Sequence, residues 1–206
     1  MQFDVYLFDF DGTLCDTRVS LVPVFRAGYA LVGREVTEEE CERWMHVSLD
    51  ESLVDSGVPA EYHKTVIDGI IAALDMPESI ALIRPFPEAY EVLTALIQQG
   101  KKVGIVSNNT ATHIRLVLKH LGFDMPLDCV VGSDMFQHGK PDPEPIDTAL
   151  SILGEKRSLK ACYIGDSLQD PQTGINAGIA GVLVDRDDTH PDFVGTKIKS
   201  LMDLLG

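Results

Sequence analysis

The chain has 206 residues, of which 45% are hydrophobic and 24% charged, a balance typical of a folded globular protein rather than a disordered one. Its formal net charge is −15 and it contains no basic run, so we expect neither nucleic acid nor an anionic membrane surface as a partner. This length allows one large domain, or a core with a smaller insert.

Along the chain, short apolar runs alternate with segments whose apolar residues recur at helical spacing. The strands predicted from the runs are Phe3–Phe8, Val103–Val106, Leu127–Val131, Ala161–Ile164 and Gly181–Val184. The helices predicted from the spacing cover residues 88–97, 114–121, 146–153 and 198–205. Apolar strands alternating with amphipathic helices indicate an α/β fold with a doubly wound parallel sheet. Ligands of such sheets bind beyond the carboxyl ends of the strands.

One interval, residues 15–84, breaks this alternation because it holds helical patterns and no convincing strand. Apolar spacing predicts helices near residues 21–28 and 66–74, and Thr37 with Glu40 forms a capping-box pattern for a third helix. We therefore expect a small helical domain, inserted after the first strand, that could cover the end of that strand. The expected domains are a core of residues 1–15 and 86–206 and an insert of residues 16–85.

Two carboxylates, Asp9 and Asp11, follow the first predicted strand, and Gly12 comes directly after them. Side chains at i and i+2 of an extended segment point to the same side, so we expect the two to converge. Such a pair needs a counter-charge, and Mg²⁺ prefers oxygen ligands. Gly12 permits a sharp turn that exposes amide groups. Taken alone, the pair fits a metal or catalytic site and an ordinary Asp-Gly turn equally well.

Polar residues also follow other predicted strands. Asp166 and Asp170 come after the fourth strand and can complete an all-oxygen magnesium site. Ser107 and Asn108 end the second strand, where a hydroxyl and free amide groups suit a phosphate oxygen, although a helix N-cap uses the same residue types. Lys140 lies in a loop that prolines restrict, where it can offset carboxylate charge and hold a phosphoryl group.

In this order, these motifs resemble those of the haloacid dehalogenase-like (HAD-like) hydrolase superfamily, and the resemblance spans nearly the whole chain. The motifs are Asp9-x-Asp11-Gly12-Thr13, Ser107, Lys140-Pro141 and Gly165-Asp166-x-x-x-Asp170. The helical insert resembles the type 1 cap of the phosphoglycolate phosphatase and β-phosphoglucomutase branch. The resemblance implies a Rossmannoid α/β core with a helical cap.

The resemblance further implies a Mg²⁺-dependent phosphatase that hydrolyses a small phosphomonoester through an aspartyl-phosphate intermediate. Asp9 would be the nucleophile, and Asp11 would protonate the leaving oxygen and then activate water. The implied phosphate-binding residues are Gly12, Thr13, Ser107, Asn108 and Lys140. The implied Mg²⁺ ligands are Asp9, Asp11, Asp166 and Asp170. In the insert, Arg43, His46 and Ser48 are candidates for reading the leaving group, whereas Trp44 is expected in the core of the insert.

Several relatives of such an enzyme remain as alternatives. Asp11 argues against a haloacid dehalogenase, which lacks it, and Lys64, the one lysine of the insert, lies far along the chain from the expected substrate loop, which argues against a phosphonatase. A phosphosugar mutase of the β-phosphoglucomutase type shares all four motifs and stays open, as do a 5′-nucleotidase and a pyrophosphatase. A receiver-like phospho-aspartate switch, the alternative from another class, has no place for the large insert.

The remaining features carry no chemistry of their own. The four cysteines contain no C-x-x-C pair and are expected to be reduced thiols: Cys15, Cys41, Cys129 and Cys162. With no basic leader and no apolar run of about 18 residues, we expect a cytoplasmic monomer or homodimer that acts on a small phosphorylated metabolite. The polar segment 185–191, after the last predicted strand of the sheet, is assigned no role.

Overall fold

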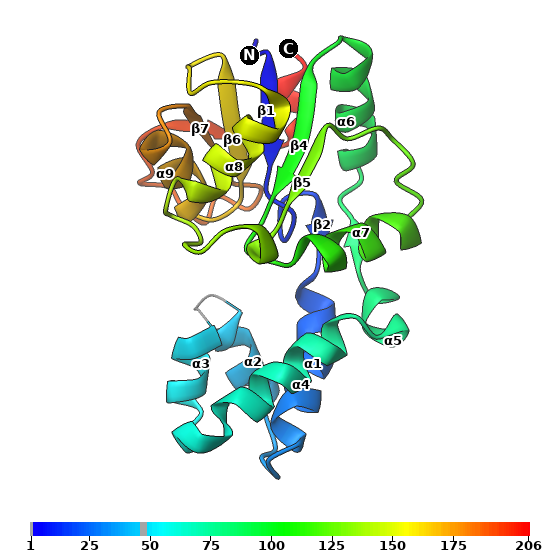
Figure 1. Ribbon diagram of the computed structural model, residues 1–206, viewed down its shortest axis with the longest axis vertical. Coiled ribbons are helices and arrows are strands. Elements are labelled where there is room, and N and C mark those ends of the chain that lie inside the picture. The colour runs from blue at the N-terminus through cyan, green and yellow to red at the C-terminus, as the bar shows by residue number, and fades with distance from the viewer. Residues whose placement is uncertain (1, 46–48) are drawn as a thin grey trace. The chain divides into compact units, whose positions relative to one another are not determined.

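The computed structural model describes residues 2–45 and 49–206 (Figure 1). The chain forms two compact units. The core unit comprises the chain up to Asp16 together with Pro85–Gly206, and the helical unit comprises Thr17–Arg84. The two connections between the units pair as short strands, β2 (Cys15–Asp16) and β3 (Arg84–Pro85), which the sequence did not predict.

The core unit contains a six-stranded sheet in the order β5-β4-β1-β6-β7-β8, with every neighbouring pair parallel. The strands are β1 (Val5–Phe8), β4 (Lys102–Val106), β5 (Cys129–Val131), β6 (Ala161–Gly165), β7 (Ala180–Val184) and β8 (Thr196–Ile198). The first strand lies at the centre, where Leu7 is opposite Gly104 of β4 and Tyr163 of β6. The predicted doubly wound parallel sheet is confirmed.

Amphipathic helices flank this sheet (Figure 1). They are α6 (Ala89–Gln98), α7 (Ala111–His120), α8 (Glu144–Leu153) and α9 (Gln169–Asn176). The first three lie where the apolar spacing predicted them. In α8, for example, Ile146 and Leu150 are buried in one cluster with Leu7 and Tyr163 of the central strands. Burial of this continuous apolar layer fixes the strands, and so fixes the positions of the residues that follow their carboxyl ends.

One predicted helix, over residues 198–205, is wrong. Residues Thr196–Ile198 form β8 beside β7, and Leu201–Leu204 form a short 3₁₀ helix, η3. A capping box of Ser200 and Asp203 begins η3. The apolar spacing arises because a strand residue, Ile198, and two residues of η3 are buried separately. Each short element thus contributes part of a stripe that resembles one helix.

The helical unit contains α1 (Arg18–Ala30), α2 (Glu38–Trp44), α3 (Leu49–Asp55), η1 (Ala60–Tyr62), α4 (His63–Leu74) and α5 (Pro77–Ile80). The two helices predicted near residues 21–28 and 66–74 are α1 and α4. These cross closely because Gly28 has no side chain: a Cβ atom there would lie 2.4 Å from Cγ1 of Ile70. Trp44 is buried as predicted and stacks on Tyr29 with 4.9 Å between ring centroids.

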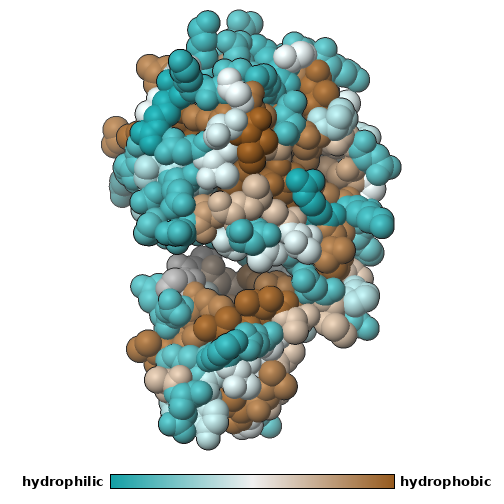
Figure 2. Space-filling view, viewed as in Figure 1, coloured by the Kyte–Doolittle hydropathy of each residue, from teal (hydrophilic) through white to brown (hydrophobic). Residues whose placement is uncertain are grey.

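Figure 2 shows hydrophilic residues over much of the displayed surface, interrupted by apolar side chains. Across residues 2–45 and 49–206, no helix combines the length and apolar character needed to span a bilayer.

The predicted capping box at the start of α2 is confirmed. The Glu40 amide donates to Oγ1 of Thr37 at 3.2 Å, and the Thr37 amide donates to Oε2 of Glu40 at 2.9 Å. Arg34 adds a hydrogen bond from Nη2 to Oε1 of Glu40 at 2.6 Å. The hydrogen bond from Arg34, with that of the Thr37 amide, lowers the pKa of Glu40 to about 2.

Glu40→Gln should therefore destabilise the chain at pH 7 by about 1–2 kcal/mol, since both the cap and the partly exposed ion pair are weakened. The pKa of Glu40 is depressed in the folded state, so its stabilisation is present above the usual carboxyl pKa and is lost as the pH falls towards 2. Thermal unfolding should show wild type and variant differing at pH 7 and converging between pH 4.5 and 2. Glu39→Gln, in the same helical turn but exposed, is the control and should change little. An equal difference at every pH would contradict the role of the ionised carboxylate.

Candidate active site

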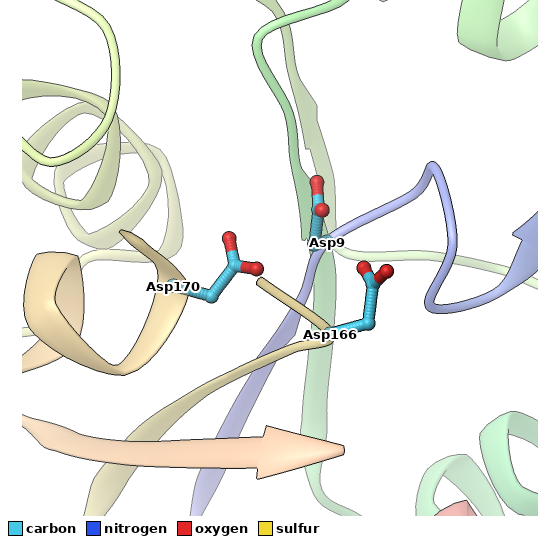
Figure 3. A group of neighbouring side chains, drawn as sticks. All are labelled: Asp9, Asp166 and Asp170. Atoms are coloured by element: carbon cyan, nitrogen blue, oxygen red, sulfur yellow. The ribbon is translucent and has the colours of Figure 1, made fainter. Parts of the chain in front are cut away.

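Three carboxylates meet beyond the carboxyl ends of the central strands (Figure 3). Asp9 directly follows β1, Asp166 directly follows β6, and Asp170 lies in the first turn of α9. One carboxylate oxygen of each lies within 4.8 Å of those of the other two. Because β1 and β6 are adjacent and parallel, their ends coincide, and the Asp9 amide donates to the carbonyl of Ile164 at 2.8 Å. The topology of the sheet therefore brings together three of the four carboxylates that the sequence predicted to share one site, Asp11 being the exception.

Lys140 joins this group as a buried cation. Its Nζ lies 2.9 Å from Oδ1 of Asp9 and donates to Oδ1 of Asp170 at 2.7 Å. The Lys140 side chain is only 7% exposed, so two carboxylates replace most of the water that would otherwise solvate the ammonium group. The loop that carries it is held by Asn108, whose Oδ1 accepts a hydrogen bond from the Lys140 amide at 3.1 Å, and by Asn176, which donates to the carbonyl of Pro141.

The electrostatics of the group favour a further positive charge. Burial raises the pKa of Asp9 well above its usual value, Lys140 opposes this, and the neighbouring carboxylates reinforce it. Burial and then Asp170 also raise the pKa of Asp166. Burial alone would lower the pKa of Lys140, but Asp9 leads the groups that raise it, so it remains an ammonium.

The donor set fits a magnesium ion. The group holds three carboxylates, of which Asp9 and Asp170 are buried and contact the Lys140 ammonium, whereas Asp166 is partly buried. Oδ1 of Asp9 contacts that ammonium without having a well-directed hydrogen-bond donor of its own. Such an excess of carboxylate oxygens is the ligand chemistry that Mg²⁺ prefers. Asp9, Asp166 and Asp170 are the residues that could hold it.

The loop after Asp9 packs directly against Asp166. Gly12 adopts φ +77°, and a Cβ atom on it would lie 2.1 Å from Oδ2 of Asp166, so only glycine fits there. Thr13 is fully buried, and its hydroxyl donates to Oδ1 of Asp166 at 3.0 Å. Two of the predicted phosphate-binding residues thus fix the position of a candidate metal ligand.

Asp11 and Ser107 lie beside this group. Ser107 Oγ donates to Oδ2 of Asp11 at 3.3 Å. Asp11 is close enough for its charge to raise the pKa of Asp9, but among the described residues its carboxylate lies outside the three-carboxylate group. It sits in a turn that bridges to Cys15 rather than in an extension of β1, so the alternation of an extended strand no longer sets its direction. Its role as a metal ligand stays a prediction.

The residues predicted for substrate selection are only partly described. Arg43 Nη2 forms an ion pair with Oδ2 of Asp55 at 3.1 Å, and Nε1 of Trp44 donates to the same oxygen at 2.8 Å. The guanidinium of Arg43 is therefore engaged within the helical unit, although its side chain is half exposed. His46 and Ser48 lie outside the described residues.

Two residues of this region were missed from the sequence. Tyr163, fully buried in β6, places its ring 5.8 Å from Nζ of Lys140 and donates its hydroxyl to the carbonyl of Val106 at 2.8 Å. Arg186, which follows β7, donates to the carbonyls of Gly12 and Thr13. Tyr163 resembled any strand residue in the sequence, but the position of Arg186 after a strand of the same sheet was a usable signal.

The family model of haloacid dehalogenase-like hydrolases matches residues 6–184. The chain is 31% identical to the pyrophosphatase PpaX of Listeria innocua over 97% of its length and 94% of that protein, and 31% identical to PpaX of Bacillus velezensis over 97% and 95%. The chain therefore belongs to the haloacid dehalogenase-like hydrolase family, as the motifs predicted.

Solved structures agree on the fold. A predicted phosphoglycolate phosphatase from Haemophilus somnus superposes with a TM-score of 0.81 at 21% identity, covering 100% of this chain and 97% of that one. A HAD-superfamily hydrolase of subfamily IA from Geobacter sulfurreducens superposes with a TM-score of 0.74 at 20% identity, covering 99% and 97%. The HAD-like Rossmannoid fold is thus confirmed.

The buried ion pairs of Lys140 predict a large loss of stability on its removal. In Lys140→Gln without Mg²⁺, Asp9 and Asp170 lose the ammonium that both contact, which should cost about 3 kcal/mol or more at pH 7. The cost should shrink as the pH falls, because Asp9 can then take up a proton. Urea unfolding at pH 7 and pH 5 measures both effects.

Lys102→Gln is the matched control, since Lys102 pairs with Glu155 where both side chains are 39% exposed. Its loss should be below about 1 kcal/mol and nearly the same at both pH values. Equal effects of the two substitutions would show that burial does not strengthen the Lys140 ion pairs.

Proposed function

We propose that the chain is a Mg²⁺-dependent phosphatase that hydrolyses a small phosphorylated substrate through an aspartyl-phosphate on Asp9. The observation that carries this proposal is the buried Asp9 carboxylate at the end of the central strand, in contact with Lys140 and grouped with Asp166 and Asp170. Membership of a hydrolase family and the names of the relatives support it.

In the first step, an oxygen of Asp9 forms a bond to phosphorus while the bond from phosphorus to the leaving oxygen breaks. Asp11 gives its proton to that oxygen. In the second step, a water molecule gives a proton back to Asp11 and attacks phosphorus, which releases phosphate and restores the Asp9 carboxylate. Covalent catalysis divides a very slow hydrolysis into two easier steps. Ser107 is placed to orient Asp11 through its 3.3 Å hydrogen bond.

The remaining motif residues stabilise charge. We assign phosphoryl binding to Lys140 and Ser107, together with Gly12, Thr13 and Asn108. Within the chain, the side chain of Asn108 also holds the Lys140 loop, and Thr13 also holds Asp166. Asp9, Asp166 and Asp170 would hold Mg²⁺, which when bound supplies positive charge to the phosphoryl oxygens.

For the domains, we propose a catalytic core of residues 1–15 and 86–206 and a cap of residues 16–85 that selects the substrate. A small phosphomonoester, as in phosphoglycolate phosphatases, is the first candidate class. Inorganic pyrophosphate is the second candidate, because relatives that match 97% of this chain carry the name pyrophosphatase.

Phosphate release from a panel tests this proposal: phosphoglycolate, sugar phosphates, nucleotides and pyrophosphate, each with and without Mg²⁺. We expect Mg²⁺-dependent release that falls by about 10³-fold or more in Asp9→Asn. Asp124→Asn, an exposed carboxylate on the surface of the core unit, is the control and should match wild type. Release that survives in Asp9→Asn would overturn the mechanism, and conversion of one sugar phosphate isomer into another without net release would indicate a mutase.

Mg²⁺ should stabilise the fold by binding the carboxylate group. At about 100 times its dissociation constant, it should add about 2.7 kcal/mol, or roughly 5 to 10 °C in Tm. Asp166→Asn should abolish this shift. In a chelator, however, the same variant should be more stable than wild type, because the folded pKa of Asp166 is raised and its charge is unfavourable at neutral pH. Calorimetry with and without Mg²⁺ measures the stabilisation by the ion and the stability of the variant in the chelator. If Mg²⁺ stabilises Asp166→Asn as much as wild type, Asp166 is not a ligand of the ion.

A further inference from the structure

The guanidinium of Arg186 contacts the loop that follows Asp9 and also two residues near the start of α6. Its Nη1 donates to the carbonyl of Gly12 and its Nη2 to the carbonyl of Thr13, each at 3.0 Å. On the other side, Nε and Nη2 donate to Oε1 of Glu88 at 3.2 and 3.0 Å. The guanidinium also stacks on the ring of Phe86, with 3.7 Å between its central carbon and the ring centroid. The guanidinium is thus hydrogen-bonded through its nitrogens, and the Phe86 ring lies against one of its faces.

The loop that carries Arg186 is itself fixed. Asp185 is buried and accepts hydrogen bonds from the amides of Thr189 and His190 at 2.7 and 3.1 Å, and from Nζ of Lys197 at 3.2 Å. Burial opposes ionisation of Asp185, but the hydrogen bonds, with that from Lys197 first, lower its pKa to about 2. Arg186 is therefore presented by an ordered loop, which limits how far it can follow a shift of its partners.

The two carbonyls that Arg186 holds belong to the residues that contact Asp166. Gly12 approaches Asp166 so closely that no Cβ atom fits between them, and the Thr13 hydroxyl donates to Asp166. Asp11 precedes these two residues directly. A displacement of this segment would move Asp11, Thr13 and the hydrogen bond to Asp166 together. A shift of about 1 Å in such a site can cost about 10²-fold in rate.

We propose that Arg186 is a positioning residue of this hydrolase, which holds the segment from Asp9 to Thr13 in its reactive geometry through the main-chain carbonyls of Gly12 and Thr13. This inference rests on the proposed function for its catalytic readout. The guanidinium does not contact any of the three grouped carboxylates through a hydrogen bond or ion pair among the described residues, so its effect passes through the loop. Lysine cannot replace it, because one ammonium cannot reach both carbonyls and Glu88 while stacking on Phe86.

The test compares Arg186→Ala and Arg186→Lys with wild type, using the best substrate of the panel at saturating Mg²⁺. Both variants should lower kcat by about 10- to 100-fold while KM changes little, because Arg186 is not assigned to phosphoryl binding. Added guanidinium ion should restore much of the kcat of Arg186→Ala by occupying the space beside Phe86, and methylammonium should not. Arg157→Ala, which removes an exposed arginine paired with Asp147, is the control and should neither lose activity nor respond to guanidinium.

A second readout needs no turnover. Titration of Mg²⁺ into the substrate-free chain by calorimetry should give a dissociation constant about 10-fold higher for Arg186→Ala than for wild type, since the hydrogen bond that orients Asp166 is loosened. Unchanged kcat and unchanged Mg²⁺ affinity, or a loss of kcat that guanidinium does not restore, would overturn the proposal. If wild type releases no phosphate from any substrate, the proposed function fails, while the Mg²⁺ titration still decides the role of Arg186. If Arg186→Ala does not fold, Arg186→Lys supplies both measurements.

Discussion

The ion pairs of Lys140 are the interaction on which the rest of the site depends. A buried ammonium contacts Asp9 and Asp170, which come from different parts of the chain, and the parallel sheet brings them together. Without that cation, three carboxylates would share one buried region, and the desolvation cost would favour their protonation or the opening of the site. The lysine therefore opposes the effect of burial on Asp9 and favours its ionised form, which is the form that the proposed nucleophile requires.

The sheet could be predicted because its strands are continuous apolar runs, and because in parallel sheets both faces are buried. The wrong helix has a different cause. Residues 198–205 are apolar at helical spacing, but Ile198 is buried as part of β8, while Leu201 and Leu204 are buried by η3. Apolar spacing reports which residues are buried and not which element buries them, so two short elements can imitate one helix.

The site was predictable to the extent that its residues follow strands. Asp9, Ser107 and Asp166 could be placed at one edge once the sheet was recognised, and Lys140 followed from its loop. Arg186 could be placed at the same edge because it follows β7, but its contacts could not be predicted, since its partners Gly12 and Thr13 offer main-chain carbonyls, which every residue type has. Tyr163 was hidden for a similar reason: its hydroxyl bonds to a carbonyl inside the core, and strand periodicity does not reveal that contact.

The imbalance of charge separates this site from a structural ion pair. A lysine buried for stability needs one carboxylate, and even that arrangement gains little over apolar packing. Here one ammonium contacts the carboxylates of Asp9 and Asp170, that of Asp166 lies within 4.8 Å of both, and burial raises the pKa of both Asp9 and Asp166. Such an arrangement is unfavourable for folding alone, and an amide at position 166 would relieve it. The proposed ligands would account for this arrangement, because a divalent cation would offset the excess negative charge and the fixed ammonium would contact a phosphoryl group.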